Sequence, residues 1–215
     1  MGPYYQWGTD LPDQYQLWGV QMPGRDQRFR DPLVSDMAEL VLGLLPALVA
    51  CADRPLIFFG HSAGAYVAIE AARRLEREQG ITVARLIVAG SNAPQTGAPL
   101  HYRLGELSDK LFLAEIRNLG GTPQQVLDHP ELLALFLPVM RADIRLAENY
   151  RVPLHEPIAA PITALRGEDD WHTGEDAMRR WGELTRGDFQ FRNVAGDHFF
   201  PYRSRRSLCE ALDES

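Results

Sequence analysis

The chain has 215 residues, of which 45% are hydrophobic and 24% are charged. This balance is that of an ordinary globular protein and excludes a mainly disordered or fibrous chain, and the length suits one compact domain. Twenty-two Lys and Arg residues against 29 Asp and Glu residues give a net charge of −7. Because an acidic surface repels phosphate backbones, nucleic acid is excluded as a partner.

The two cysteines, Cys51 and Cys209, lie far apart and form no CxxC pair. They indicate neither a disulfide framework nor a zinc site, so a reducing, cytoplasmic setting fits best. The longest apolar run, residues 40–51, is interrupted by glycine and proline and is too short to span a bilayer. The N-terminus has neither the basic flank nor the hydrophobic core of a signal peptide, and we expect no membrane association.

Apolar strands and amphipathic helices alternate in the first half of the chain. Residues 16–21 form a short apolar stretch that ends at Met22-Pro23-Gly24, which predicts a strand that runs into a loop. Residues 32–51 carry apolar side chains at three-and-four spacing, which predicts a helix. The elements expected next are a strand buried on both faces at 55–59, a helix at 63–79 and a second buried strand at 83–89.

The pattern becomes helical between about residues 97 and 161. Helices are predicted there at 111–118, 123–127, 130–137 and 139–150, and strands return at 162–166 and 189–194. Buried strands that alternate with helices predict an α/β fold with a mostly parallel sheet covered on both sides. We therefore expect one domain over residues 1–215, with a helical insertion at about 97–161 as a candidate lid.

The sharpest chemical signal is Gly60-His61-Ser62-Ala63-Gly64, which lies between a predicted strand and a predicted helix. In this context G-x-S-x-G predicts a strained turn that projects the hydroxyl of Ser62, while small neighbours let the strand and helix approach each other. Without that context the pattern is weak. The alternative is a glycine-rich turn with no nucleophile.

A serine nucleophile needs a base to accept its proton and an acid to orient that base. In a fold of this kind the acid and then the histidine follow the serine along the chain. His198 directly follows the last predicted strand and is the expected base, whereas His172, its competitor, precedes that strand.

Three adjacent carboxylates follow the strand at 162–166, in the loop Gly167-Glu168-Asp169-Asp170-Trp171. We expect Asp170 to orient the histidine, with Asp169 as the alternative. Together with His172 the carboxylates could also suggest a metal site, but no regular ligand spacing supports one, so no metal is expected.

Five motifs together resemble the type II thioesterases of nonribosomal peptide and polyketide synthase pathways, which have the α/β-hydrolase fold. The motifs are Met22-Pro-Gly-Arg25, Gly60-His-Ser-Ala-Gly64, Leu137-Pro-Val-Met-Arg-Ala-Asp143, Gly167-Glu-Asp-Asp170 and Gly196-Asp-His-Phe-Phe200. The resemblance extends over nearly the whole chain. The resemblance implies that the enzyme hydrolyses acyl thioesters on the phosphopantetheine arm of an acyl or peptidyl carrier protein, without a cofactor.

Site residues follow from the same resemblance. Ser62 is implied as the nucleophile, His198 as the general base and Asp170 as the orienting acid. The backbone N–H of Ala63 is implied as one oxyanion donor. The family often has Met in place of Ala63 and Pro in place of Trp171, two positions that supply no triad chemistry.

The N-terminus departs further from the family pattern. Members begin with an additional strand and a glycine-containing loop whose N–H completes the oxyanion hole, and here only a short segment precedes the first predicted strand. Gly2 is the expected remnant of that loop. Losing one such donor typically costs about 10²–10³ in rate. The alternatives left open are a small-molecule esterase or acyltransferase and a weakly active protein that binds acyl carriers.

Basic side chains are candidates for meeting an acidic carrier protein. The alternative is that they are solvated surface residues. The candidates are Arg25, Arg28 and Arg30, or Arg203, Arg205 and Arg206.

Overall fold

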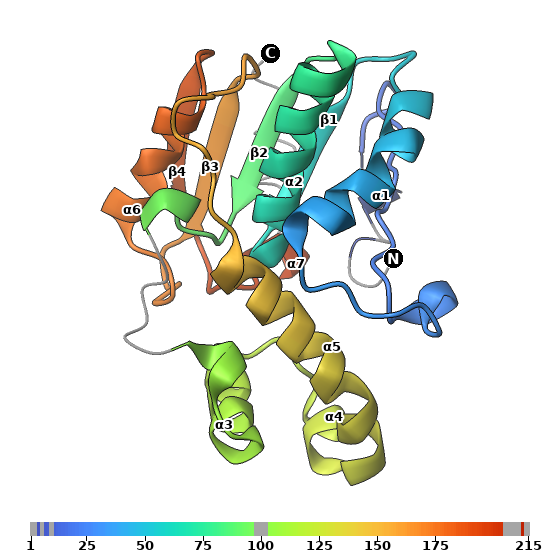
Figure 1. Cartoon of the computed structure of the whole chain (residues 1–215). Coiled ribbons are helices and arrows are strands. Elements are labelled where there is room, and N and C mark those ends of the chain that lie inside the picture. Colours follow the sequence, from blue (N-terminus) through green and yellow to red (C-terminus); the bar gives the residue numbers. More distant parts are fainter. Residues whose placement is uncertain (1–3, 5–6, 9–10, 97–102, 204–211, 213–215) are drawn as a thin grey trace.

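The computed structural model of the chain describes residues 4, 7–8, 11–96, 103–203 and 212. Its centre is a sheet of four strands in the order β1-β2-β3-β4, and every neighbouring pair is parallel (Figure 1). The strands are β1 (Ile57–His61), β2 (Arg85–Ala89), β3 (Ile162–Gly167) and β4 (Phe189–Val194). The predicted parallel sheet is confirmed, and its topology places the carboxyl ends of all these strands at one edge.

Helices cover one face of the sheet. Both α1 (Met37–Ala50) and α2 (Ala63–Arg74) lie against it, and α6 (Glu175–Arg179) packs beside β3 (Figure 1). The side chain of Asp36 begins α1 by accepting a hydrogen bond from the N–H of Glu39 at 2.8 Å, which satisfies one of the free donors of the first turn. After α2 the chain stays helical through a π-helical turn, Leu75–Gln79.

Alternating side chains of the strands supply two cores. On β2, Leu86 and Val88 pack with α1 and α2, whereas Ile87 and Ala89 point to the opposite face. That opposite face is covered by N-terminal residues and by α7 (Phe200–Arg203). There the buried Trp7 packs edge-on against Phe59, with 4.8 Å between the ring centroids. The sheet is therefore buried on both faces, as its continuous apolar runs predict.

A helical insertion extends from the edge where the strands end (Figure 1). Its described residues, 103–161, include α3 (Asp109–Leu119), α4 (Gln124–Asp128) and α5 (Pro130–Asn149). These helices have their own small core of Phe112, Ile116 and Leu127. Two helices divided at Pro138 were expected, but α5 runs through it. The proline removes one helical donor, and packing of α5 on both sides of it keeps the helix continuous.

The predicted strand at residues 16–21 is wrong, because this segment belongs to no strand of the structure. A strand needs a neighbour that exchanges backbone hydrogen bonds with it, and an apolar stretch does not reveal whether one exists. Trp18 and Val20 are 68% and 54% exposed, so the segment also lacks a second buried face. Gly2, Arg205 and Arg206 lie outside the described residues.

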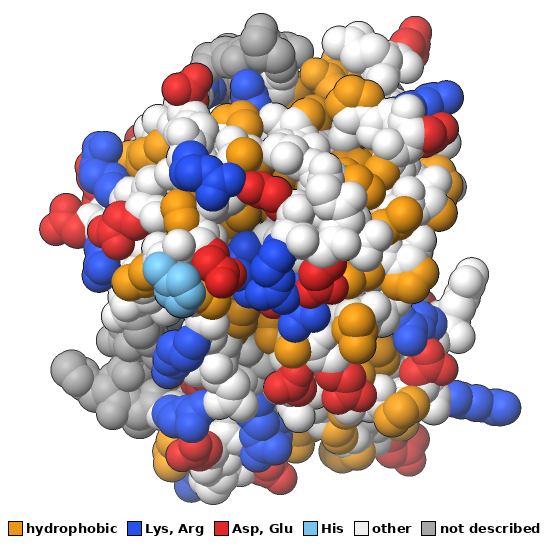
Figure 2. Space-filling view, turned by 45° about the horizontal axis from the view of Figure 1, so that its top comes forward, with side chains coloured by type: hydrophobic (Ala, Val, Ile, Leu, Met, Phe, Trp, Pro, Cys, Tyr) orange, Lys and Arg blue, Asp and Glu red, His pale blue; other side chains and the backbone are white. Residues whose placement is uncertain are grey.

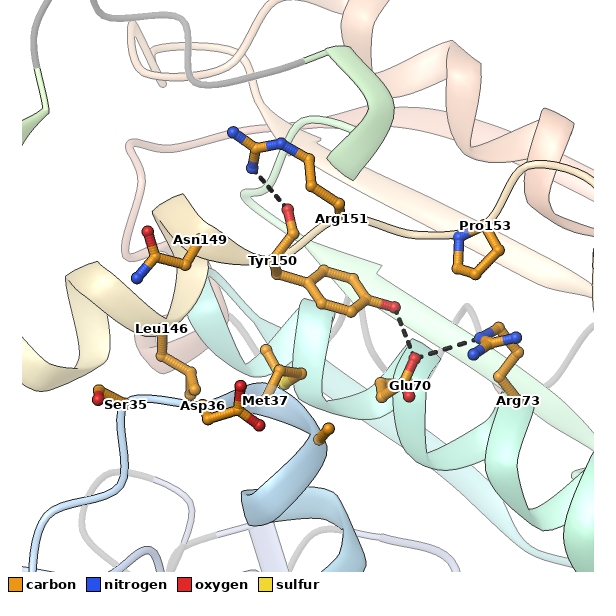
Figure 3. A pocket seen from close by; sticks show the side chains of 11 residues that line it. Ser35, Asp36, Met37, Glu70, Arg73, Leu146, Asn149, Tyr150, Arg151 and Pro153 are labelled. Atoms are coloured by element: carbon orange, nitrogen blue, oxygen red, sulfur yellow. Dashed lines mark hydrogen bonds and ion pairs between the residues drawn. The ribbon is translucent and has the colours of Figure 1, made fainter.

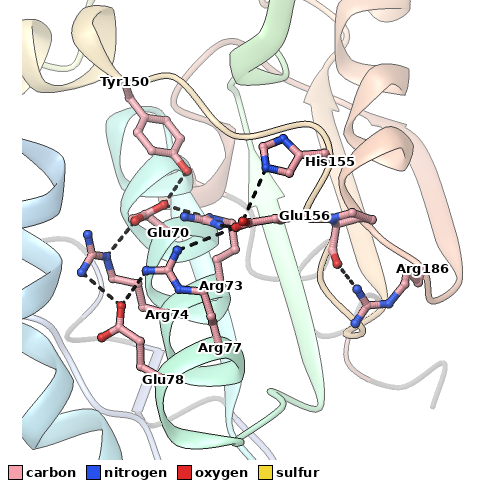
Figure 4. Close-up of polar contacts among 10 residues, drawn as sticks. Glu70, Arg73, Arg74, Arg77, Glu78, Tyr150, His155, Glu156 and Arg186 are labelled. Atoms are coloured by element: carbon pink, nitrogen blue, oxygen red, sulfur yellow. Dashed lines mark hydrogen bonds and ion pairs between the residues drawn. The ribbon is translucent and has the colours of Figure 1, made fainter.

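Buried polar side chains join the end of α5 to α2 (Figure 4). The carboxylate of Glu70 accepts hydrogen bonds from Tyr150 Oη at 3.1 Å, Arg73 Nε at 3.2 Å and Arg74 Nε at 2.8 Å. Burial and the neighbouring Glu70 charge raise the pKa of Tyr150 well above its ordinary value. Each of these buried polar groups needs the others as hydrogen-bond partners. The junction therefore fixes the insertion to the core at one point.

None of the described helices combines the length and the apolar character needed to cross a membrane.

Candidate active site

Ser62 lies in the tight turn between β1 and α2. Its φ of 53° and ψ of −125° form a strained conformation, and Asp26 is the only other described non-glycine residue with a positive φ. A Cβ on Gly60 would lie 2.3 Å from the carbonyl oxygen of Gly64, so only glycine lets the strand and helix approach this closely. The turn thus has the strained geometry that its sequence predicts.

Ala63 is the first residue of α2. The first N–H groups of a helix have no partner within it, and the helix dipole adds positive potential at that end. The N–H of Ala63 therefore belongs to a backbone region suited to a developing negative charge.

Asp170 and His198 meet at the same edge of the sheet. Asp170 follows β3 and is 0% exposed, and its Oδ2 lies 3.0 Å from Nδ1 of the buried His198, which follows β4. The other carboxylate oxygen accepts the backbone N–H of His172 at 3.0 Å. A carboxylate can only accept, so His198 carries its proton on Nδ1 and leaves Nε2 free to take another.

Asp170 is held as a carboxylate in spite of its burial. Burial alone raises its pKa, but the hydrogen bond and charge of His198, together with the backbone N–H of His172, bring the pKa below its ordinary value. An ionised Asp170 accepts the Nδ1 hydrogen of His198 and so holds the imidazole in one tautomer.

The two alternatives from the sequence occupy different positions. Asp169 is exposed, and its backbone N–H donates to the carbonyl of Gly196 at 3.0 Å. His172 lies close to the site, with 5.4 Å between its ring centroid and that of His198, but it contacts Asp170 through its main chain. Burial and the neighbouring His198 charge lower the pKa of His172 to about 4. The side chain that meets the buried carboxylate is therefore that of His198.

Gly90, which follows β2, was not singled out from the sequence. It has a φ of +58°, and a Cβ there would lie 3.1 Å from Nε2 of His61 and 3.3 Å from Nδ1 of His198. Glycine at this position makes room for both imidazoles beside the end of β2.

The helical insertion reaches the histidine loop through Phe199. The Phe199 ring stands edge-on to that of His198, with 5.0 Å between the centroids. It also fills the space beside Gly121, between α3 and α4, where a Cβ would lie 2.2 Å from its Cζ. The insertion is thus in contact with the residue next to the candidate base.

A second contact joins the insertion to the loop at residues 22–25. Arg25 donates two hydrogen bonds to the carboxylate of Asp143 on α5, at 2.9 and 2.7 Å. This fork-to-fork pairing fixes orientation as well as distance. It connects two of the motifs that the sequence singled out and whose roles it left open.

A cavity of about 330 Å³ lies elsewhere, between the start of α1, α2 and the end of α5 (Figure 3). Its lining includes Glu70, Arg73 and Tyr150 and none of the residues expected in the triad. Glu70 and Arg73 in it are paired with each other, as described above. The cavity belongs to the junction between the insertion and the core and lies apart from the contact between Asp170 and His198.

Charges of both signs are intermingled on the face of the molecule shown in Figure 2. Three of the arginines considered for docking pair with carboxylates of the chain: Arg25 as described above, Arg28 with Asp31 at 2.7 Å and Arg203 with Asp197 at 2.8 Å. Among the described residues, no group of three or more His, Cys, Asp or Glu side chains is arranged to hold a metal ion.

The parallel sheet, the serine turn and the histidine loop define an α/β-hydrolase fold. The chain belongs to the thioesterase family, whose model, described as "Thioesterase domain", matches residues 3–215. Thioesterase PikA5 of Streptomyces venezuelae is 35% identical over 215 residues, which cover 98% of this chain and 75% of that protein.

Solved structures agree with this assignment. The type II thioesterase BorB from the borrelidin biosynthetic cluster superposes with a TM-score of 0.86 at 36% identity, covering 98% of this chain and 85% of that one. YbtT, a type II thioesterase from the yersiniabactin NRPS/PKS biosynthetic pathway, gives 0.82 at 30% identity, with 90% and 78% covered. The expected resemblance to type II thioesterases is confirmed, and the protein is a thioester hydrolase.

Proposed function

We propose that this thioesterase removes acyl groups from the phosphopantetheine arms of acyl or peptidyl carrier proteins by a Ser–His–Asp mechanism. The observation that carries the proposal is the buried contact of 3.0 Å between Asp170 and His198, beside a serine in a strained strand-to-helix turn. Relatives named as type II thioesterases of peptide and polyketide pathways support the substrate class. The two separated cysteines fit a cytoplasmic site of action.

Acylation begins with attack of Ser62 Oγ on the thioester carbonyl carbon, while Nε2 of His198 accepts the hydroxyl proton. The oxygen of the tetrahedral intermediate becomes negative and is stabilised by the N–H of Ala63. When the intermediate collapses, the carbon–sulfur bond breaks and the pantetheine thiol leaves with the proton from His198. The acyl group is then bound to Ser62 as an ester.

Deacylation repeats these steps with water. His198 takes a proton from the water as it attacks the acyl-serine, and returns that proton to Ser62 when the ester bond breaks. The products are the free acid and regenerated enzyme. In both halves the ionised Asp170 stabilises the imidazolium and keeps Nε2 available.

We further propose that the helical insertion, expected at about residues 97–161, acts as the lid of this site. Contact between Gly121 and Phe199 places the loop between α3 and α4 beside the histidine loop. The Arg25–Asp143 pair and the junction at Tyr150 hold α5 to the core. A lid in this place excludes water from the acyl group before attack.

Replacing Ser62 with Ala tests the proposal. We expect release of short acyl groups from acyl-phosphopantetheine carriers to fall by about 10⁴-fold or more, because the nucleophile is lost. The wild-type protein should hydrolyse carrier-bound thioesters in preference to aryl esters of the same acyl group. Unchanged release by Ser62→Ala would refute the triad, and a strong preference for aryl esters would favour a small-molecule esterase.

A further inference from the structure

His61, the residue before Ser62, joins the nucleophile turn to the histidine loop. It is buried, and its Nε2 lies 2.7 Å from the backbone carbonyl oxygen of His198. Its Nδ1 lies 3.0 Å from the hydroxyl of Tyr202 on α7. That hydroxyl is in turn 3.1 Å from the hydroxyl of Tyr4. A continuous chain of hydrogen bonds therefore runs from the N-terminal segment to the main chain of the candidate base.

The direction of each bond in this chain is determined by the carbonyl at its end. A carbonyl oxygen only accepts, so Nε2 of His61 must carry the hydrogen. In a neutral imidazole Nδ1 is then an acceptor, and Tyr202 must donate its hydroxyl hydrogen to it. Tyr4 consequently donates to the oxygen of Tyr202. The carbonyl of His198 thus sets the neutral tautomer of His61, and Tyr202 satisfies its Nδ1.

A neutral His61 is also what its surroundings favour. Burial is the main cause that lowers its pKa from 6.5 to about 4, and the charge of His198 lowers it further. The His198 ring lies close by, with 4.8 Å between the two ring centroids. His61 therefore stays uncharged while His198 carries the transferred proton, and the two rings do not compete for it.

Two contacts together determine where the free nitrogen of His198 points. Asp170 holds the ring through Nδ1, at 3.0 Å. His61 holds the main chain of the same residue, and His61 is itself covalently joined to Ser62. A ring fixed at Nδ1 can still swing if its backbone shifts. The contact from His61 removes that freedom and ties base and nucleophile into one hydrogen-bonded unit.

We propose that His61, whose Nδ1 accepts a hydrogen bond from Tyr202, is a positioning residue that holds His198 in register with Ser62. This role rests on the proposed triad, because His61 acts through His198 and does not touch the reacting atoms. A misplacement of about 1 Å can cost about 10²-fold in rate, so the contact matters for turnover although it adds no chemistry of its own.

Substitutions at His61 separate positioning from packing. His61→Phe keeps a ring but removes the donor, and we expect it to lower kcat by about tenfold or more with KM unchanged. His61→Gln places an amide N–H near the position of Nε2 and should stay within about threefold of wild type. The rate at which a serine-directed phosphonate labels Ser62 should follow kcat in both variants.

Tyr202→Phe removes a single oxygen and leaves Nδ1 of the buried His61 without its donor. We expect it to lower kcat by about fivefold, the effect of one lost hydrogen bond. Thr185→Val is the control, because it also removes a hydroxyl bond, to the carbonyl of Ala160 at 2.6 Å, at the amino ends of β3 and β4 and away from the triad. It should lower the melting temperature and leave kcat unchanged. If His61→Phe does not fold, Tyr202→Phe and its control carry the test.

Three outcomes would overturn the positioning role: wild-type kcat in His61→Phe, equal losses in His61→Gln and His61→Phe, or wild-type kcat in Tyr202→Phe. Ser62→Ala distinguishes this failure from failure of the proposed function. If Ser62→Ala abolishes hydrolysis while the His61 and Tyr202 variants are fully active, the triad stands and only the positioning role is wrong. If Ser62→Ala remains active, the proposed function itself fails.

Discussion

Replacing Asp170 with Asn changes one atom at the centre of the site. The carboxylate accepts from His198 Nδ1 at 3.0 Å and from the backbone N–H of His172 at 3.0 Å. In the variant, the amide oxygen stays on the backbone N–H and the amide NH₂ faces Nδ1. Because NH₂ only donates, Nδ1 must become an acceptor and the hydrogen moves to Nε2. His198 then cannot accept the proton of Ser62.

We therefore expect Asp170→Asn to lower kcat by about 10⁴-fold, the effect of the wrong tautomer in a serine–histidine–aspartate site. KM should change little, because Asp170 is buried behind the histidine and is 0% exposed. Release of a short acyl group from a carrier-bound thioester, followed by high-performance liquid chromatography, measures both constants. A thermal melt checks that the variant is folded.

Asp169→Asn is the matched control, because it makes the same chemical change at the neighbouring, exposed carboxylate. Its activity should stay within about twofold of wild type, as expected for a solvated side chain. If Asp170→Asn retained a tenth of the activity, or if Asp169→Asn lost as much as Asp170→Asn, the assignment of the orienting acid would be wrong.

Three further predictions concern the insertion and the buried imidazole. Gly121→Ala should lower kcat/KM severalfold, because its Cβ would lie 2.2 Å from Phe199 Cζ. Gly80→Ala is its control, because Gly80 has a similar positive φ but open space around it. It should lower the free energy of unfolding in a denaturant melt by the same backbone strain, about 1–2 kcal/mol, and leave kcat/KM unchanged. The side chains of Arg25 and Asp143 are 29% and 33% exposed, so a double-mutant cycle of unfolding should give a coupling free energy of about 0.5–1 kcal/mol. Additive effects of the two alanine variants would show that this ion pair does not stabilise the contact between the loop at residues 22–25 and α5. Burial lowers the pKa of His61 from 6.5 to about 4, so the unfolded chain binds more protons than the folded chain between these pH values. The stability present above pH 6.5 is therefore lost as the pH falls toward 4. A plot of melting temperature against pH should be flatter for His61→Gln over this range, and parallel plots for the two proteins would contradict a neutral His61.

Local chemistry was predictable from the sequence where it depends on neighbours in the chain. Small residues around Ser62 predict the strained turn, and that turn is present with a φ of 53°. The continuous apolar runs predict strands buried on both faces, as β2 is. The placement of Asp170 and His198 after successive strands predicts that they meet, since parallel strands end at one edge.

Features that depend on distant partners were not predictable in the same way. Residues 16–21 have a strand-like pattern but no neighbouring strand, and Pro138 lies in a helix whose packing outweighs one lost donor. Sequence spacing placed His61 on the nucleophile turn without revealing its bond to His198. That bond joins residues 137 positions apart along the chain, and only the fold brings the two together.

The most direct test of the mechanism is to trap the acyl-enzyme. The wild-type protein is mixed with an acyl carrier, quenched within one turnover, and examined by intact mass and peptide mapping. We predict an added mass equal to the acyl group less one hydrogen on the peptide that contains Ser62, with stoichiometric release of the carrier thiol and no adduct in Ser62→Ala. An acyl group on any other residue, or hydrolysis by Ser62→Ala at the wild-type rate, would contradict the account.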